Sequence, residues 1–192
     1  MRTYNSLRNM GGQMSSERAI RIAELIASFL TADVFIHNFI RSAFDELYAN
    51  RHGGAFIKPN GRAQWFNKSD LRNSSIRTLL LGDFKHRSPD AENILDGYDR
   101  TQDLPDDVDL ICEHVVPCGI LERMLRDDAA AGIVTPEHVF KFQDKYYRRC
   151  ILTADENAKL SKNAMPDDWC RESGKVFARY IHAGFLWADR FD

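Results

Sequence analysis

The chain has 192 residues, of which 44% are hydrophobic and 28% are charged, and its formal net charge at pH 7 is -2. These values are typical of a globular protein with one domain, or one domain and a small appendage, that buries a core of its own. They exclude a chain that is basic throughout, so a nucleic-acid partner would need a local cluster of Lys and Arg.

The first part of the chain predicts helices. The segment 15–30, "SSERAIRIAELIASFL", begins with a capping serine and carries apolar residues at helical spacing. The segment 31–51 restarts this pattern at Thr31. It places His37 on its apolar side, where we expect a histidine that is satisfied within the core.

The segment 59–84 opens on a turn signal and predicts one or two further helices. Its basic residues are interleaved with aromatic ones, a pattern that can bind nucleic acid but that more often belongs to a half-solvated amphipathic helix, which we expect here. The residues concerned are Arg62, Lys68, Arg72, Arg77, Trp65 and Phe66. Residues 85–108 are polar and rich in turn residues, so we expect a surface connection there.

The second half predicts two short strands with two helices between them. Residues 108–117, "VDLICEHVVP", form a β-rich apolar run that ends at a proline, and 150–153, "CILT", form a second run. Between them we expect one helix over 119–132 and another that starts at Thr135 and Pro136, a capping residue followed by a first-turn proline.

Two more helices are expected after the second strand. The segment 154–163, "ADENAKLSKN", follows Thr153, which with Glu156 has the spacing of a capping box. Residues 169–191 predict a final helix in which Gly184 is a stop signal.

The four cysteines include no CxxC pair, so we expect neither a structural zinc site nor disulfides; they are Cys112, Cys118, Cys150 and Cys170. The N-terminal segment lacks the apolar region of a signal peptide. No apolar run approaches the roughly 20 residues that span a bilayer. We therefore expect a reduced, cytoplasmic protein without a membrane partner.

Glu113 and His114 are costly to bury, yet they stand side by side in an apolar strand. The stretch 112–117, "CEHVVP", resembles the first motif of HNH endonucleases, in which an acidic residue and a histidine precede two aliphatic residues and a proline. The stretch 151–166, "ILTADENAKLSKNAMP", resembles the second half of that motif, where a short strand runs into a helix that carries a metal-binding Asn or His. The resemblance does not reach the N-terminal half.

The resemblance implies a ββα-metal fold that hydrolyses phosphodiester bonds with one divalent ion, Mg²⁺ or Mn²⁺. It makes His114 the general base and Glu113 and Asn157 the metal ligands. A neutral histidine suits the activation of water near pH 7, and a hard divalent ion suits oxygen ligands. Nearby cationic side chains are candidate phosphate contacts, namely Lys159, Arg148, Arg149 and Arg179.

Departures from the family pattern leave some assignments open. The middle Asn of the family has no counterpart, because Arg149 or Cys150 stands at that position. Two predicted helices are inserted between the halves of the motif. Asp155 or Glu156 could replace Asn157 as a ligand, although the capping box makes Glu156 a cap.

The neighbouring pair also places a demand on geometry. Adjacent residues of a strand point to opposite faces of the sheet. Glu113 and His114 can therefore share a site only if the strand is bulged or twisted, or if an ion approaches from its end.

We thus expect an α+β protein that is predominantly α-helical. An N-terminal helical region over 1–105 would precede an HNH-like ββα-metal core with inserted helices and a C-terminal helix over 106–192. The expected activity is cleavage of nucleic acid, DNA rather than RNA, with the N-terminal helices serving substrate docking, a homodimer contact or another partner. The alternative is a non-enzymatic interaction or inhibitor protein on a degenerate nuclease or helical fold.

Overall fold

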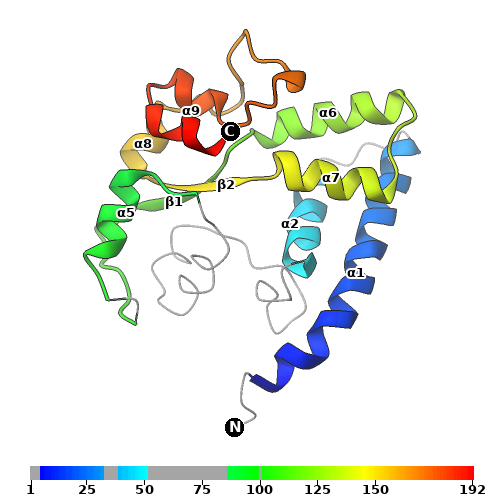
Figure 1. The fold of residues 1–192 in the computed structure, drawn as a ribbon, viewed down its shortest axis with the longest axis horizontal. Coiled ribbons are helices and arrows are strands. Elements are labelled where there is room, and N and C mark those ends of the chain that lie inside the picture. Colours follow the sequence, from blue (N-terminus) through cyan, green and yellow to red (C-terminus); the bar gives the residue numbers. More distant parts are fainter. Residues whose placement is uncertain (1–4, 33–38, 52–85, 100) are drawn as a thin grey trace. The chain divides into compact units, whose positions relative to one another are not determined.

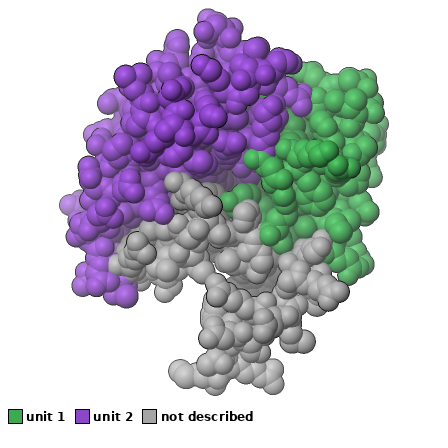
Figure 2. Space-filling view, viewed as in Figure 1, with its two compact units in different colours: residues 1–65, 122–144 green, residues 66–121, 145–192 purple. Residues whose placement is uncertain are grey.

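A computed structural model of the chain describes residues 5–32, 39–51, 86–99 and 101–192 (Figure 1). The chain divides into two compact units, which Figure 2 colours separately: residues 1–65 with 122–144, and residues 66–121 with 145–192. The boundary at residue 105 that the sequence suggests stays a prediction. The predicted helices over 59–84 and the histidine at position 37 lie outside the described residues.

The first unit contains helices α1 (Asn5–Thr31) and α2 (Phe39–Arg51), which pack against each other. Apolar residues at helical spacing form its core, so the periodicity in the sequence reflects real burial. The buried residues include Ala23, Ile26, Phe44 and Leu47. Helix α1 begins at Asn5, ten residues before the serine that the sequence marks as its start.

The second unit is built on two antiparallel strands, β1 (Leu110–His114) and β2 (Arg149–Thr153), which confirm the two predicted strands. Leu110 pairs with Thr153 at one end of the ladder and His114 with Arg149 at the other. The backbone N–H of Val115 then donates to the carbonyl of Arg148 at 2.9 Å, so pairing continues one step beyond the strands.

In the sequence, the two predicted helices follow β1 and precede β2, as α6 (Cys118–Ala130) and α7 (Pro136–Tyr146). Gly132 has a φ of 71°, a left-handed conformation that favours glycine and turns the chain after α6. The hydroxyl of Thr135 accepts from the backbone N–H of His138 at 3.1 Å and caps α7, as predicted.

Helix α8 (Ala154–Lys159) follows β2 directly and packs against both strands. The predicted capping box is confirmed, because Thr153 accepts from the Glu156 N–H while Glu156 accepts from the Thr153 N–H. In this unit the order is therefore β1, β2, α8, and most of α6 and α7, which stand between the strands in the sequence, belongs to the first unit.

The stretch 85–108, expected to be a surface connection, contains an additional element, α5 (Pro89–Asp96). Ser88 caps this helix and also donates from its hydroxyl to Glu156 Oε2 at 2.5 Å. Arg87 forms a parallel bridge with Ile151, which places this stretch on the side of β2 away from β1.

The final helix predicted over 169–191 is wrong as a continuous element. The chain forms η1 (Arg171–Ser173), α9 (Ala178–His182) and η2 (Leu186–Phe191) in its place. Gly174 and Gly184 interrupt it with φ values of 73° and 89°, which no right-handed helix contains.

The described part of the chain is thus an α+β structure, predominantly helical, with a small two-stranded sheet. Within it, no helix is both long and apolar enough to span a membrane.

Candidate functional site

Glu113 and His114 occupy the last two positions of β1 and follow the regular alternation of a strand. His114 is 7% exposed and lies on the buried face with Leu110 and Cys112, whereas Glu113 lies on the opposite, half-buried face. The register stays regular through both residues, so no bulge brings their side chains together. They can share a ligand only at the end of the strand, one of the arrangements that the sequence required.

The Glu113 carboxylate is paired with Arg179 of α9. Arg179 Nη2 lies 3.1 Å from Glu113 Oε1 and also donates to the backbone carbonyl of His114. Arg179 Nη1 donates to the carbonyl of Ser161 at 2.6 Å. One guanidinium therefore ties the end of β1 to the chain that leaves α8.

The two oxygens of this carboxylate are in different situations. Oε1 is engaged by Arg179, while Oε2 accepts no hydrogen bond from the described residues. The Glu113 side chain is 27% exposed and that of Arg179 only 2%. Glu113 thus presents one oxygen for a ligand and holds the other against a buried cation.

The His114 ring rests on Tyr147 in an edge-on contact, with ring centroids 5.2 Å apart. Its Nε2 lies 3.3 Å from the Tyr147 hydroxyl, and Arg149 Nη2 donates to the same hydroxyl at 2.9 Å. Tyr147 therefore links the histidine to the arginine that faces it in the sheet and fixes the plane of the ring.

Asn157 is the fourth residue of α8 and is half-buried. Its side-chain amide makes no hydrogen bond to any residue in the described ranges. Ser161, whose carbonyl binds Arg179, follows Asn157 by one helical turn of sequence. Glu156 is 4% exposed and its Oε2 accepts from Thr153 and Ser88, which makes it a cap, while Asp155 is exposed.

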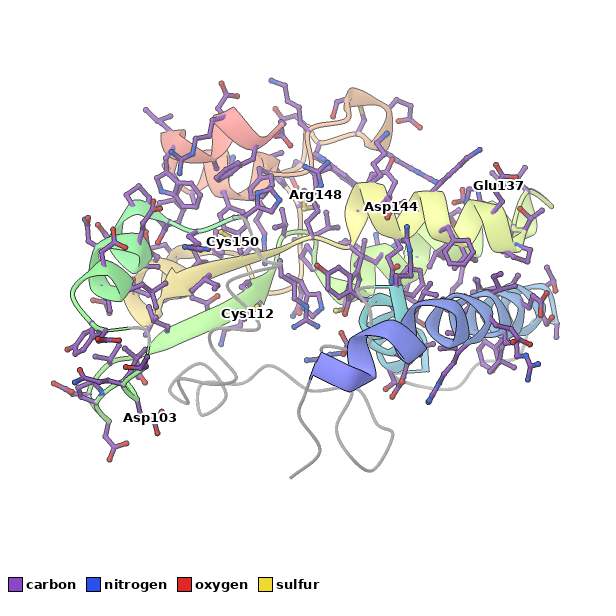
Figure 3. The ribbon with its side chains drawn as sticks, turned by 60° about the horizontal axis from the view of Figure 1, so that its bottom comes forward. Asp103, Cys112, Glu137, Asp144, Arg148 and Cys150 are labelled. Atoms are coloured by element: carbon purple, nitrogen blue, oxygen red, sulfur yellow. The ribbon has the colours of Figure 1, made fainter. Side chains whose placement is uncertain are left out.

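The residue that faces Glu113 across the ladder is neutral. Cys150 faces Glu113 across the strands, and burial raises the pKa of its thiol well above the usual range, with Cys112 and Glu156 adding to the effect. Burial likewise raises the pKa of Tyr180 well above its ordinary value. Figure 3 shows Cys112 and Cys150 on the two paired strands. The charged side chains at this end of the sheet therefore include Glu113, Arg179 and Arg149.

The four candidate phosphate contacts differ in exposure. Lys159 is exposed, with its ammonium 5.8 Å from the centre of the Phe185 ring, and Arg148 is half-buried and donates to the carbonyl of Phe191 at 3.0 Å. Arg149 and Arg179 are 5% and 2% exposed. The phosphate role stays a prediction for all four, and it needs least rearrangement for Lys159.

A cleft of about 690 Å³ runs beside the chain that leaves α8. Its lining includes Lys159, Ser161, Asp168, Arg179 and His182. Arg179 thus borders this cleft and also contacts the end of β1.

No cluster of three or more His, Cys, Asp or Glu side chains suited to a metal ion occurs among the described residues. Glu113 and Asn157 offer one carboxylate oxygen and one amide oxygen, which are hard ligands. Mg²⁺ and Mn²⁺ accept such sets because they keep several bound waters. In their chemistry, these two oxygens are therefore of the type that a small divalent ion accepts.

Tyr147, Ser161 and Ser88 were not among the residues that the sequence marked as functional. Ser88 had a detectable signal, since Ser-Pro-Asp is typical of a helix start. Tyr147 contributes a phenol oxygen and Ser161 a backbone carbonyl, and no local sequence pattern predicts either contact.

Comparison of the chain with protein-family models, with curated proteins and with solved structures found no match.

Proposed function

We propose that this protein is a metal-dependent endonuclease of the HNH type that hydrolyses phosphodiester bonds. One observation carries the proposal: Glu113 and His114 end the first strand of an antiparallel pair, and the helix with Asn157 directly follows the second strand. The strand-strand-helix order and the three residue types agree with the resemblance in the sequence.

In this proposal His114 accepts a proton from the attacking water. We assign this role to His114 by its residue type and its place at the end of β1, since a neutral imidazole can accept a proton near pH 7. The Tyr147 hydroxyl, which also accepts from Arg149, holds the His114 ring in its orientation.

Glu113 Oε2 and the Asn157 amide oxygen would hold one Mg²⁺ or Mn²⁺ ion. A bound ion would supply positive charge for the phosphate and the leaving oxygen. Arg179 keeps the Glu113 carboxylate in place, and Lys159, at the edge of the cleft, is the candidate contact for a neighbouring phosphate.

The proposed substrate is DNA, with RNA as the second choice, and homodimer formation through the N-terminal helices is part of the same proposal. All four cysteines are free thiols, which suits a reducing compartment such as the cytoplasm.

The test is cleavage of supercoiled plasmid, linear DNA and RNA by the purified protein, with Mg²⁺ or Mn²⁺ against a chelator. We expect His114→Ala to lower the cleavage rate by about 10² or more, the usual effect of losing a general base. His138→Ala is the matched control, because His138 pairs with Asp128 in the other unit. Equal cleavage by wild type and His114→Ala would contradict the proposal.

A second candidate is an interaction protein without catalysis. It is favoured by the fact that both residues that are costly to bury already have a partner within the protein: Glu113 pairs with Arg179, and His114 contacts Tyr147. Such pairing is how a structural role for a buried charge would look.

Metal titration separates the two candidates. A nuclease should be stabilised against heat by Mn²⁺, and Asn157→Ala should remove most of that stabilisation. A binding module should melt at the same temperature with or without Mn²⁺, and Asn157→Ala should then leave its melting temperature indifferent to the ion.

A further inference from the structure

The second unit contains a buried arginine, Arg179, whose terminal nitrogens are engaged in bonds within the protein. Its side chain is 2% exposed, and its two terminal nitrogens bond to three acceptors. These are the Ser161 carbonyl, the His114 carbonyl and Glu113 Oε1. Releasing Glu113 would leave a buried cation without its counter-charge, which is costly.

The consequence for Glu113 is that one of its two oxygens is occupied from inside the protein. Oε1 is held by the guanidinium, and only Oε2 is open to a ligand from solvent. A carboxylate held in this way can bind an ion through Oε2 without disturbing Arg179, whereas chelation through both oxygens would compete with the Arg179 bond to Oε1.

Divalent ions differ in how they respond to this restriction. Mg²⁺ and Mn²⁺ favour octahedral coordination in which a carboxylate contributes one oxygen and water fills the remaining positions. Ca²⁺ takes six to eight oxygens and commonly uses both oxygens of a carboxylate. A one-oxygen Glu113 therefore favours the smaller ions.

We propose that Arg179 is a positioning residue that makes Glu113 a one-oxygen ligand and so gives the site a preference for Mn²⁺ and Mg²⁺ over Ca²⁺. This rests on the proposed function, in which Glu113 binds the ion. It assigns Arg179 to the carboxylate rather than to the phosphate of the substrate.

The role requires the guanidinium and not merely a positive charge. Arginine presents its donors as a rigid planar fork, whereas lysine has one compact ammonium. A lysine at this position could neutralise Glu113 but could not bond to Ser161, His114 and Glu113 in the same arrangement. Arg179→Lys therefore separates positioning from charge.

The experiment measures the affinities of Mn²⁺ and of Ca²⁺ separately, by calorimetry, for wild type, Arg179→Lys and Arg179→Gln. We expect wild type to bind Mn²⁺ more tightly than Ca²⁺ by on the order of tenfold, and both variants to lose most of that ratio, as expected for a residue that orients a ligand. Arg51→Lys is the matched control, since Arg51 also bonds to several acceptors but in the first unit.

A second measurement needs no variant. In isotope-labelled wild type, we expect the buried guanidinium N–H signals to stay in slow exchange when Mg²⁺ is added, because Arg179 keeps its bond to Glu113. Loss of these signals on binding would overturn the inference.

The remaining outcomes are distinct. Equal affinity of wild type for both ions, or an unchanged ratio in folded Arg179→Lys and Arg179→Gln, overturns the role of Arg179 while the nuclease proposal stands. Failure of wild type to bind either ion removes the metal site itself, and the proposed function fails with it.

Discussion

Each unit of this protein contains an arginine that joins distant parts of the chain, and the two arginines are in opposite surroundings. In the first unit Arg51, whose side chain is 26% exposed, bonds to Gln143 at 2.8 Å and to Asp144 at 2.7 Å, and the Asp144 side chain is 61% exposed. In the second unit Arg179 bonds to Glu113 and two backbone carbonyls with 2% of its own side chain exposed.

The difference in burial indicates which of the two arginines contributes more to stability. Water can replace the partners of Arg51, because exposed ion pairs contribute little. Water cannot easily replace the partners of Arg179, since breaking a buried pair leaves a desolvated charge behind. The interior arginine therefore determines local structure, while the surface arginine adds to a contact made mainly by apolar residues.

The largest expected effect is on stability when each arginine is removed. We expect Arg179→Ala to lower the free energy of unfolding by about 3 kcal/mol, the lower end for a broken buried pair because Glu113 keeps some contact with water. Arg51→Ala should cost less than about 1 kcal/mol. Urea unfolding monitored by circular dichroism measures both, and equal losses would show that burial does not distinguish the two arginines.

Two helix caps show the same contrast between buried and exposed contacts, with smaller expected effects. Thr153 caps α8 within a buried group that contains Glu156 and Ser88, whereas Thr135 caps α7 at an exposed position. We expect Thr153→Ala to cost about 2 kcal/mol and Thr135→Ala about 0.5 kcal/mol, the two ends of the usual range. Thermal melts of the two variants and of the matched Thr→Ser replacements provide the measurement. A larger loss for Thr135→Ala would contradict this order.

The smallest effect concerns thiol chemistry, which reports on burial without changing the fold. Cys112 and Cys150 are buried, and burial raises the pKa of Cys150, so its thiol stays protonated and unreactive near pH 8. Cys170 is exposed and should react first with a disulfide reagent. Labelling followed by mass spectrometry identifies the modified residue. Rapid modification of Cys150 in the native protein would show that the sheet opens.

The sequence predicted those parts of the structure that depend on neighbouring residues. The start of α7 at Thr135-Pro136 and the capping box at Thr153 and Glu156 are local signals, and both are confirmed. The two strands were visible as apolar runs bounded by turn signals. Their pairing completes the strand-strand-helix order.

The parts that could not be predicted depend on residues far apart in the chain. Arg179 and Glu113 are separated by 66 positions, and Ser88 and Glu156 by 68. Neither hydrophobic periodicity nor motif spacing predicts a bond between residues so far apart in the sequence. The predicted helix over 169–191 failed for a different, local reason, since Gly174 as well as Gly184, the stop signal of the sequence, has a positive φ.

The bond from Val115 to Arg148 has a consequence for protein engineering. This hydrogen bond joins the two ends of the segment that connects β1 to β2. The register of the two strands is therefore fixed whatever the length of that segment. Lengthening a loop between fixed ends costs free energy only slowly. The exposed turn at Gly132, between α6 and α7, is therefore a natural place to insert a reporter or a foreign binding domain while the pair of strands keeps its alignment.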